Sequence, residues 1–319
     1  MDCMVPRPRA ELRGARVGAP FVPSCLLIRV NPCKSVVASH AARCSSLLSR
    51  RRATNYTRCM NRRSFKFIWL FILICTTAAF CQQQTERTLK VLTYNIHHAN
   101  PPSRPGLIDV KAIAKVINES GADVVGLQEV DVHTLRSGKD LNQAAELAKL
   151  TGMHYYFAKA LDFEGGDYGQ AILSKFPILH GETLPLPLEG GEHRALGVVT
   201  IEPAPGKKIL FANTHLDLRP NNRVLQVNFI REYFAKQTLP VILCGDFNAR
   251  PDQETIRDLD QMFRRSTVAS GLTFPMINPD REIDFVMYRP AESFSVKNHV
   301  VISEQYASDH LPVMVTLSY

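Results

Sequence analysis

Cysteine is nearly missing from most of this 319-residue chain. Seven of the eight cysteines lie at or before Cys81, and only Cys244 follows. Because one cysteine cannot form a disulfide by itself, residues 82–319 must be stabilised by a hydrophobic core rather than by crosslinks. Cys244 follows the apolar run Val241-Ile-Leu. We predict a buried core thiol there, with a nucleophilic cysteine as the alternative.

The sequence also contains only one tryptophan, and it lacks zinc-binding motifs and internal repeats. The single tryptophan is Trp69, in the N-terminal part of the chain. The histidines match no zinc-binding spacing, and no cysteine cluster accompanies them. No repeat has the period of a solenoid or a propeller, and no low-complexity linker follows residue 85. We therefore predict one domain over residues 86–319.

An excess of positive charge occurs only near the N-terminus. The formal net charge of the chain is +8, but residues 1–81 hold 14 of the 38 Lys and Arg and only two acids. Residues 82–319 carry 24 basic and 28 acidic side chains, a net charge of −4. A net-acidic domain does not attract nucleic acid through its overall charge, although a local basic groove would still do so.

Residues 60–82 have the composition of an export signal. A short cationic stretch that starts at Met60 precedes the uncharged apolar residues 67–80. Fourteen apolar residues are short for a membrane span and typical of a secretory signal. With cleavage near residues 79–81, the protein would be secreted or periplasmic. A signal anchor that holds the protein in a membrane through residues 67–80 is one alternative, and a lipid on Cys81 is another.

Residues 1–59 are rich in Arg, Ser, Ala and Pro and show no periodicity. If translation starts at Met60, these residues are never made. If they are made, we expect a disordered leader. A basic arm that binds nucleic acid is the alternative, but an export signal directly after such an arm argues against it.

Strands and helices are both predicted in the rest of the chain. Apolar residues at helical spacing predict helices over 107–120, 141–150, 222–234 and 253–260, and Gly121 and Gly152 end the first two. Apolar or alternating runs predict strands over 89–96, 124–130, 168–173, 195–201, 209–214, 240–244, 283–288, 296–301 and 311–317. This mixture indicates two packed sheets flanked by helices, an α/β sandwich.

Polar side chains follow several of these apolar runs. Asn95 ends the first strand, Glu129 follows an apolar run in the second, and His215 follows another such run. For His215, a hydrogen-bonded core histidine without a catalytic role is the alternative. A carboxylate at the end of a buried strand is costly unless it is paired or bound to a metal. Carboxylate and amide oxygens suit Mg²⁺, and such an ion beside Asp, Asn and His is what phosphate-ester hydrolysis requires. The pattern predicts one pocket at one sheet edge.

Asp246 and Asn248 are two residues apart, so on an extended chain they share one face. Gly245 would let the backbone turn tightly before them. One side chain would exchange a proton, and the other would donate a hydrogen bond to a phosphoryl oxygen. A plain Asx turn after a strand is the alternative.

Asp309 and His310 form a second polar pair. One of them could bind a metal while the other reaches a partner, for which Asp284 is the candidate. A carboxylate on one ring nitrogen of His310 would fix its tautomer and suit it to activate water near neutral pH. A solvated surface pair is the alternative. Arg194, which opens a strand, would clamp a phosphate or form a surface ion pair.

Together these motifs resemble the endonuclease/exonuclease/phosphatase superfamily of DNase I-like hydrolases. The resemblance covers nearly all of residues 88–319, in the same motif order. Asn95 and Glu129 resemble the first-strand Asn and the metal-binding Glu of that family, and His215 stands at the position of its mid-domain His or Tyr. Its Gly-Asp-(Phe/Leu)-Asn motif and its closing residues are matched by Asp246, Asn248, Asp284, Asp309 and His310.

The resemblance implies a four-layer αββα sandwich of two mainly antiparallel sheets, and Mg²⁺-dependent cleavage of phosphoesters, with Mn²⁺ as the alternative ion. By this resemblance Glu129 and Asp309 hold the metal, with Asn95 near it. His310, oriented by Asp284, is the partner of the attacking water or of the phosphate, and Asp246 is the rival general base. The phosphoryl oxygens are bound by Asn248 and His215, and Arg194 is a candidate contact to the substrate phosphate.

The subfamily is indicated by what is missing. The aromatic-Cys-Asp-Arg segment of inositol 5-phosphatases is replaced by Asn278-Pro-Asp-Arg-Glu-Ile-Asp284, and the Trp-bearing motifs of abasic-site nucleases do not occur. The pattern looks most like secreted bacterial members of unknown substrate, and distantly like sphingomyelinase-type or glycosylphosphatidylinositol-linked relatives. We expect a monomeric, secreted or membrane-anchored phosphodiesterase or phosphatase that acts on a lipid-like or small phosphoester rather than on nucleic acid. A secreted DNase and a non-catalytic binding module are the alternatives.

Overall fold

The computed structural model describes residues 87–267, 269 and 271–319. The predicted leader over 1–59 and the predicted signal over 60–82 lie outside these residues. Within the described part of the chain, none of the helices has the length and apolar character needed to cross a membrane.

The strands of this part form two six-stranded sheets. The first sheet has the order β11-β12-β1-β2-β4-β3, with bounds Ser295–Val301, Val313–Ser318, Thr88–Asn95, Val124–Val132, Gly166–Ser174 and His154–Phe163. The second has the order β5-β6-β7-β8-β10-β9, with bounds Ile178–Pro185, Ala195–Ala204, Lys207–His215, Val241–Asp246, Asp284–Arg289 and Arg264–Arg265. Neighbouring strands are antiparallel except β1 with β2 and β7 with β8.

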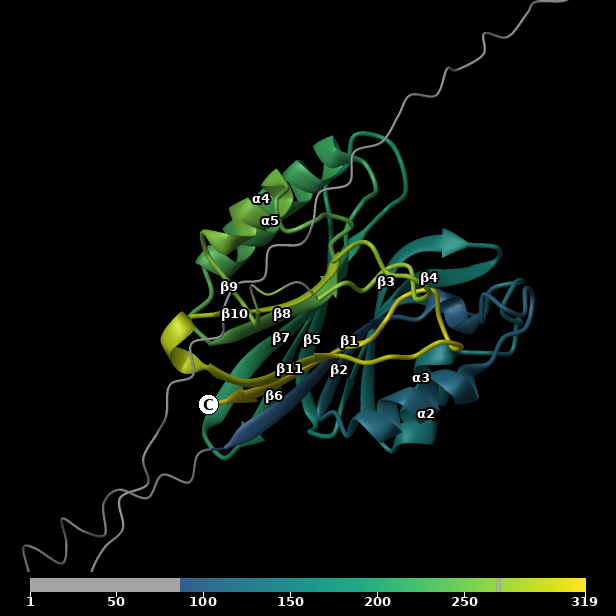
Figure 1. Ribbon diagram of the computed structural model, residues 1–319, viewed down its shortest axis with the longest axis horizontal. Coiled ribbons are helices and arrows are strands. Elements are labelled where there is room, and N and C mark those ends of the chain that lie inside the picture. Colours follow the sequence, from purple (N-terminus) through teal and green to yellow (C-terminus); the bar gives the residue numbers. More distant parts are fainter. Residues whose placement is uncertain (1–86, 268, 270) are drawn as a thin grey trace, which may run out of the picture. The chain divides into compact units, whose positions relative to one another are not determined.

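The two sheets pack face to face between two layers of helices. Apolar side chains of both inner faces, among them Val91, Ile172, Phe211 and Ile242, form the central core. Helices α2 (Val110–Ser120) and α3 (Gln143–Thr151) cover the first sheet, and α4 (Pro220–Ala235) and α5 (Glu254–Asp260) cover the second (Figure 1). This is the αββα sandwich that the sequence predicts.

Helix ends follow local capping. Helix α2 begins at Val110, three residues later than predicted, because the Asp109 carboxylate accepts a hydrogen bond from the amide of Ala112 at 3.0 Å. Gly121 and Gly152 end α2 and α3 in the left-handed conformation, with φ of 66° and 68°, as the sequence predicts.

Strands β3, β5 and β9 were not predicted. All three lie at sheet edges, where a strand has one neighbour and is covered less completely. Only one of the ten residues of β3 is buried, and none of the eight residues of β5. Their sequences therefore lack the apolar runs that reveal the central strands.

A buried polar contact joins the two sheets below one edge. The side-chain amide of Asn213, on β7, donates to the carbonyls of Leu127 (2.8 Å) and Ala171 (3.0 Å) in the first sheet. Its Oδ1 accepts from Gln128 Nε2, also in the first sheet, at 2.6 Å. Because β1–β2 and β7–β8 are parallel pairs, this contact lies close to the carboxyl ends of four strands.

Candidate active site

Three site residues lie side by side across the second sheet. Asp246 on β8 is the direct neighbour of His215 on β7 and of Asp284 on β10, and all three are buried. A tight turn was predicted at Gly245, but β8 continues through this residue to Asp246. A Cβ at Gly245 would lie 2.0 Å from the Thr214 carbonyl oxygen, so only glycine lets β7 and β8 approach this closely.

The strand that carries Glu129, β2, continues to Val132, two residues beyond its predicted end at Val130. The β2–β4 register shifts between Leu127 and Val130, and Glu129 adopts a left-handed φ of 57°. This bulge turns one side chain out of the regular alternation. Burial alone would raise the pKa of Glu129, but the polar groups of His98, His215 and Asn95 hold the pKa well below its usual range.

Asn95 connects the two sheets at this edge. Its Nδ2 donates to Glu129 Oε1 in the first sheet and to Asp246 Oδ2 in the second, each at 3.1 Å. The hydroxyl of Ser308 donates to the backbone carbonyl of Asn95 at 2.7 Å and lies 3.3 Å from Asp309 Oδ1. The side chain of Asn95 thus joins Glu129 to Asp246, and its backbone carbonyl holds the segment that carries Asp309.

His310 lies beside the two buried acids of the second sheet. Its Nδ1 is 3.0 Å from Asp284 Oδ2, the partner that the sequence predicts, and its Nε2 is 3.6 Å from Asp246 Oδ2. Burial by itself would lower the pKa of His310, but the charges of Asp284 and Asp246 outweigh burial and raise the pKa to about 10. The two carboxylates therefore favour the protonated form of His310.

His215 has the opposite environment. Its Nε2 is 3.4 Å from Asp246 Oδ2, and its Nδ1 is 3.0 Å from Arg194 Nη1. Burial, and then the charge of Arg194, hold the pKa of His215 well below its usual range. Arg194 is itself buried and lies against this imidazole and Glu192.

Asn248 forms the turn that was the alternative interpretation. Its backbone amide donates to Asp246 Oδ1 at 2.9 Å, which is an Asx turn, and its φ is 47°. Its Nδ2 donates to the carbonyl of Leu216 at 2.9 Å. One of the two Nδ2 hydrogens of Asn248 is therefore already bonded within the protein. Only the second Nδ2 hydrogen is left to donate to a phosphoryl oxygen.

A divalent cation fits the donors at this edge. Among the described residues, ligand atoms of Asp246, Asp284 and His310 lie within 4.8 Å of one another. Burial, and then the charge of Asp284, raise the pKa of Asp246 to about 7, and Asp284 Oδ1 is buried without a hydrogen-bond partner. A cation would offset the repulsion between these carboxylates, whose hard oxygens suit Mg²⁺ or Mn²⁺.

This grouping differs in part from the predicted ligands Glu129, Asp309 and Asn95. Glu129 and Asn95 reach it through the hydrogen bond to Asp246, whereas Asp309 is tied in through Ser308. The sequence could not show the grouping of Asp246, Asp284 and His310. Its two acids come together because β8 and β10 pair as antiparallel neighbours.

Two contacts to the site were not predicted. The hydroxyl of Thr273 donates to Asp284 Oδ2 at 2.5 Å, and the ring of Phe274 lies 4.6 Å from that of His310, between centroids. Both residues belong to the long connection between β9 and β10, which has no periodic pattern. No feature of the residue types themselves could have identified them.

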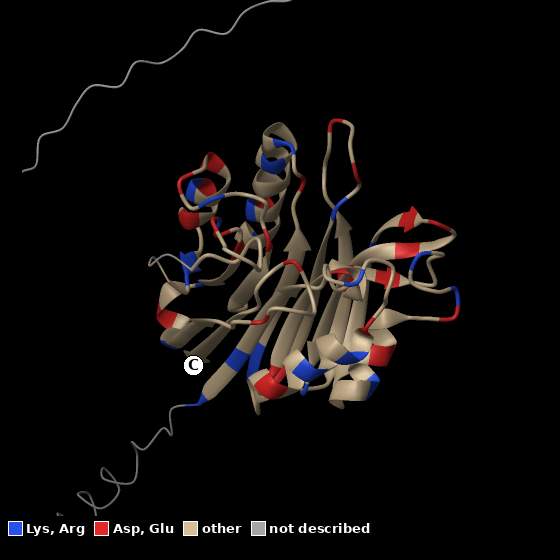
Figure 2. Cartoon of the chain, turned by 45° about the vertical axis from the view of Figure 1, so that its right-hand side comes forward, with Lys and Arg blue, Asp and Glu red and all other residues tan. Residues whose placement is uncertain are grey.

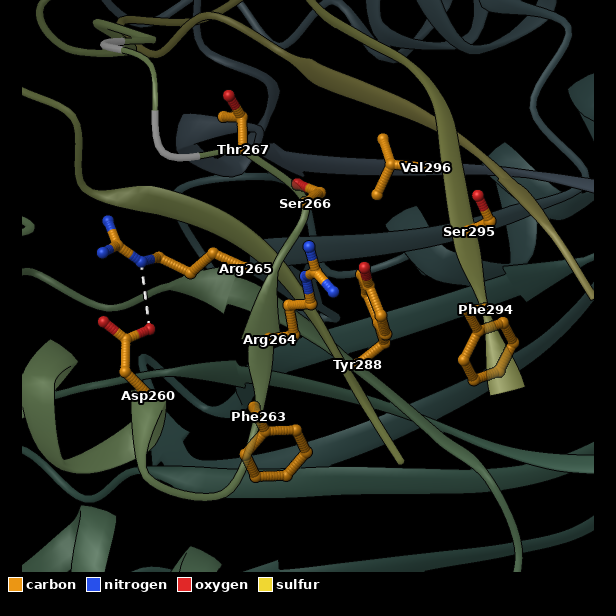
Figure 3. Close-up of a pocket in the computed structure, with 10 residues that line it drawn as sticks. All are labelled: Asp260, Phe263, Arg264, Arg265, Ser266, Thr267, Tyr288, Phe294, Ser295 and Val296. Carbon is orange, nitrogen blue, oxygen red and sulfur yellow. Dashed lines mark hydrogen bonds and ion pairs between the residues drawn. The ribbon is translucent and has the colours of Figure 1, made fainter. Parts of the chain in front are cut away.

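A separate cleft of about 640 Å³ lies beside β9 and the start of β11 (Figure 3). Its walls include Arg264, Tyr288 and Phe294, and Arg265 forms an ion pair with Asp260 at 3.0 Å. None of the predicted site residues lines it. The chemistry-bearing residues therefore belong to the sheet edge and not to this cleft.

Similar sequences are known. The model of the endonuclease/exonuclease/phosphatase family matches residues 92–310 of this chain. The uncharacterized protein YbhP of Escherichia coli (strain K12) is 27% identical over 245 residues, which cover 72% of this chain and 96% of YbhP. The matched range of the family model contains the polar residues from Asn95 to His310.

Solved structures share the architecture. An endonuclease/exonuclease/phosphatase from Beutenbergia cavernae has a TM-score of 0.61 and 26% identity, covering 73% of this chain and 72% of that one. The mannosyl-6-phosphatase Bt3783 of Bacteroides thetaiotaomicron has a TM-score of 0.60 and 22% identity, covering 72% of this chain and 100% of that one. At this lower identity the likeness concerns the fold.

Proposed function

Because this chain belongs to the endonuclease/exonuclease/phosphatase family, we propose that it is a divalent-cation-dependent hydrolase of phosphoesters. The observation that carries the proposal is the position of Asp246. Its Oδ2 lies 3.4 Å from His215 Nε2 and 3.6 Å from His310 Nε2, and the Asn95 amide connects it with Glu129 of the other sheet. A core histidine or a surface acid pair would need no such convergence.

The proposed ion is Mg²⁺, with Mn²⁺ as the alternative. Glu129, Asn95 and Asp309 would hold it, near the group formed by Asp246, Asp284 and His310, to which Asn95 Nδ2 connects Glu129 through its bond to Asp246. When bound, the cation supplies positive charge to the phosphoryl oxygens and to the leaving oxygen.

The protonation states favour a division of roles between Asp246 and His310. With a pKa raised to about 7, Asp246 can take a proton from an attacking water near neutral pH. With a pKa raised to about 10, the His310 imidazolium donates rather than accepts, and so stabilises charge on the phosphoryl group. Asp284, at 3.0 Å, orients that ring.

The proposed substrate is a lipid-like or small phosphoester. One neighbour of the same fold is a mannosyl-6-phosphatase, which supports a small substrate. In Figure 2, acidic and basic residues are interspersed over the helices and loops, and this mixture gives little support to nucleic acid. We also propose a secreted or periplasmic monomer, or one held to a membrane through residues 67–80, from the composition of residues 60–82.

A substrate panel tests the proposal. Wild type and His310→Ala would be assayed with Mg²⁺ on bis(4-nitrophenyl) phosphate, 4-nitrophenyl phosphate, sphingomyelin, hexose phosphates, inositol phosphates and DNA. We expect Mg²⁺-dependent cleavage of a small or lipid-like ester, and a loss of about 10²–10⁴-fold in His310→Ala. Activity confined to DNA, with affinity falling steeply in salt, would instead identify a nuclease. No cleavage of any ester by folded wild type would contradict the proposal.

A further inference from the structure

The contact between Arg194 and His215 fixes which nitrogen of the imidazole carries the proton. Arg194 is 5% exposed, and its Nη1 lies 3.0 Å from His215 Nδ1. A guanidinium has donors and no acceptor, so Nδ1 must be the acceptor in this hydrogen bond. The proton of a neutral His215 is then on Nε2.

The Nε2 side of His215 faces the centre of the site. Its distance to Asp246 Oδ2 is 3.4 Å, which is longer than the 2.7–3.2 Å of a normal N–H···O bond. Asp246 Oδ2 already accepts from Asn95 Nδ2 at 3.1 Å. The Nε2 proton is therefore only loosely engaged by the protein and is available to an oxygen of the substrate.

Arg194 is also held by an acid. The Nη1 that contacts His215 lies 3.0 Å from Glu192 Oε1 as well. The loop before Glu192 is fixed to α4 by Asn222, which accepts from the amide of Glu189 and donates to the carbonyl of Gly190, each at 2.8 Å. Arg194 Nε is buried without a hydrogen-bond partner, so the guanidinium is not arranged as a two-pronged clamp on Glu192.

The two histidines beside Asp246 thus have opposite partners. His310 has a carboxylate on Nδ1, whereas His215 has a guanidinium on Nδ1. The Nδ1 atom of His310 therefore faces an acceptor, whereas the Nδ1 atom of His215 faces a donor and must itself accept. The Nε2 atoms of both rings lie near the same carboxylate oxygen, Asp246 Oδ2.

We propose that Arg194 is a positioning residue that holds His215 as the neutral Nε2–H tautomer, so that His215 donates a hydrogen bond to the phosphoryl oxygen and does not act as a base. This proposal rests on the proposed function. It replaces the expectation that Arg194 clamps the substrate phosphate directly.

The test uses NMR of the full chain with ¹⁵N-labelled histidine, without added metal. His215 is assigned by comparison with His215→Gln. In wild type we expect Nδ1 of His215 to show the shift of an unprotonated acceptor and Nε2 that of a protonated nitrogen. In Arg194→Met we expect this pattern to be lost, and in Arg194→Lys, which keeps a cationic donor, to be retained in part. A proton on Nδ1 in wild type, or an unchanged pattern in Arg194→Met, would overturn the proposal.

Kinetics separate positioning from direct binding. Because Arg194→Met removes the residue that orients His215, we expect its kcat to fall about 10–100-fold, with KM changing by less than about threefold. A rise in KM with unchanged kcat would show a direct phosphate clamp instead and overturn the proposal. Arg265→Met removes an arginine that is likewise paired with one acid but lies in the cleft of Figure 3, and should change neither kcat nor the His215 pattern.

Two further outcomes are decisive. If Arg194→Met fails to fold, Glu192→Gln, which keeps the arginine but removes its charged anchor, should shift the His215 pattern part of the way, and no shift would count against the proposal. If wild type cleaves no phosphoester yet shows the Nε2–H tautomer, the proposed function fails while the tautomer assignment stands.

Discussion

At the residue scale, Asp246 shows the conflict between stability and function most clearly. Its carboxyl group is 1% exposed and lies in register with Asp284, so ionisation puts two negative charges close together in the protein interior. Burial and this neighbour raise the pKa of Asp246 to about 7. A residue with these properties is a poor choice for stability and a suitable one for proton transfer.

Asp246→Asn should therefore be inactive yet more stable at alkaline pH. The pKa of Asp246 is higher in the folded than in the unfolded chain, so its ionisation lowers stability as pH rises from about 4 through about 7. Without added metal, we expect the melting temperatures of variant and wild type to be closest at about pH 4. The difference in favour of the variant should grow by several degrees up to just above pH 7 and then level off, while kcat falls at least about 10³-fold. A constant difference across this range would contradict the raised pKa.

The residue types of the site could be predicted, but their contacts could not. Asn95 and Asp246 are recognisable as polar groups at the ends of apolar runs, and His310 as one that directly precedes such a run. The left-handed φ of Glu129 is a property of a bulge, which no residue type encodes by itself. The guanidinium on His215 depends on the pairing of β6 with β7, so the sequence permitted a phosphate clamp equally well.

At the scale of elements, the site depends on how closely β2 approaches β7 and β8. Gly126 on β2 faces the second sheet, and a Cβ there would lie 2.4 Å from Cys244 Sγ and 3.0 Å from Asn213 Cγ. Cys244 is fully buried and its pKa is raised by burial, which agrees with the predicted core thiol. The glycine thus sets the separation of the sheets beneath the catalytic edge.

Gly126→Ala should lower the free energy of unfolding by about 1–3 kcal/mol through overpacking. Adding Cys244→Ala removes the sulfur that the new methyl group meets, so the double variant should be more stable than the sum of the two single effects by at least about 0.5 kcal/mol. Urea denaturation of wild type, the two single variants and the double variant gives the four free energies of unfolding that this comparison needs. Gly152→Ala, whose Cβ would meet nothing within 4 Å, is the control and should show no such coupling with Cys244→Ala. Additive effects at Gly126 would mean that the sheets are farther apart than described.

The central strands and one edge strand, β11, could be predicted, whereas the edge strands β3, β5 and β9 could not. The strands that carry Asn95, His215, Asp246 and Asp284 are continuous apolar runs, because they are covered on both faces. The edge strands β3 and β5 are partly exposed and have no such pattern. Strand order was likewise beyond the sequence, since it depends on contacts between residues far apart in the chain.

At the scale of the whole molecule, folding brings acids of both sheets to one edge, where their mutual repulsion lowers the stability of the fold. A bound cation should offset part of this repulsion. We expect Mg²⁺ or Mn²⁺ to raise the melting temperature of wild type in proportion to the logarithm of concentration above Kd, since the unfolded chain has no such site. Glu129→Gln should reduce the increase markedly. Asp260→Asn, which removes an acid paired with Arg265 at the separate cleft, should leave it intact. Equal increases in all three proteins would indicate general ionic effects.

The most direct measurement is cleavage of bis(4-nitrophenyl) phosphate across a range of Mg²⁺ concentrations by wild type and Glu129→Gln. Convergence of the two sheets on one cation predicts that wild type saturates with Mg²⁺ and loses activity in chelator. The variant, which changes a residue of the opposite sheet from Asp246, should need more Mg²⁺ and turn over at least about 10-fold more slowly. Wild-type turnover that persists in chelator, or a variant with the same Mg²⁺ curve, would contradict a shared metal site.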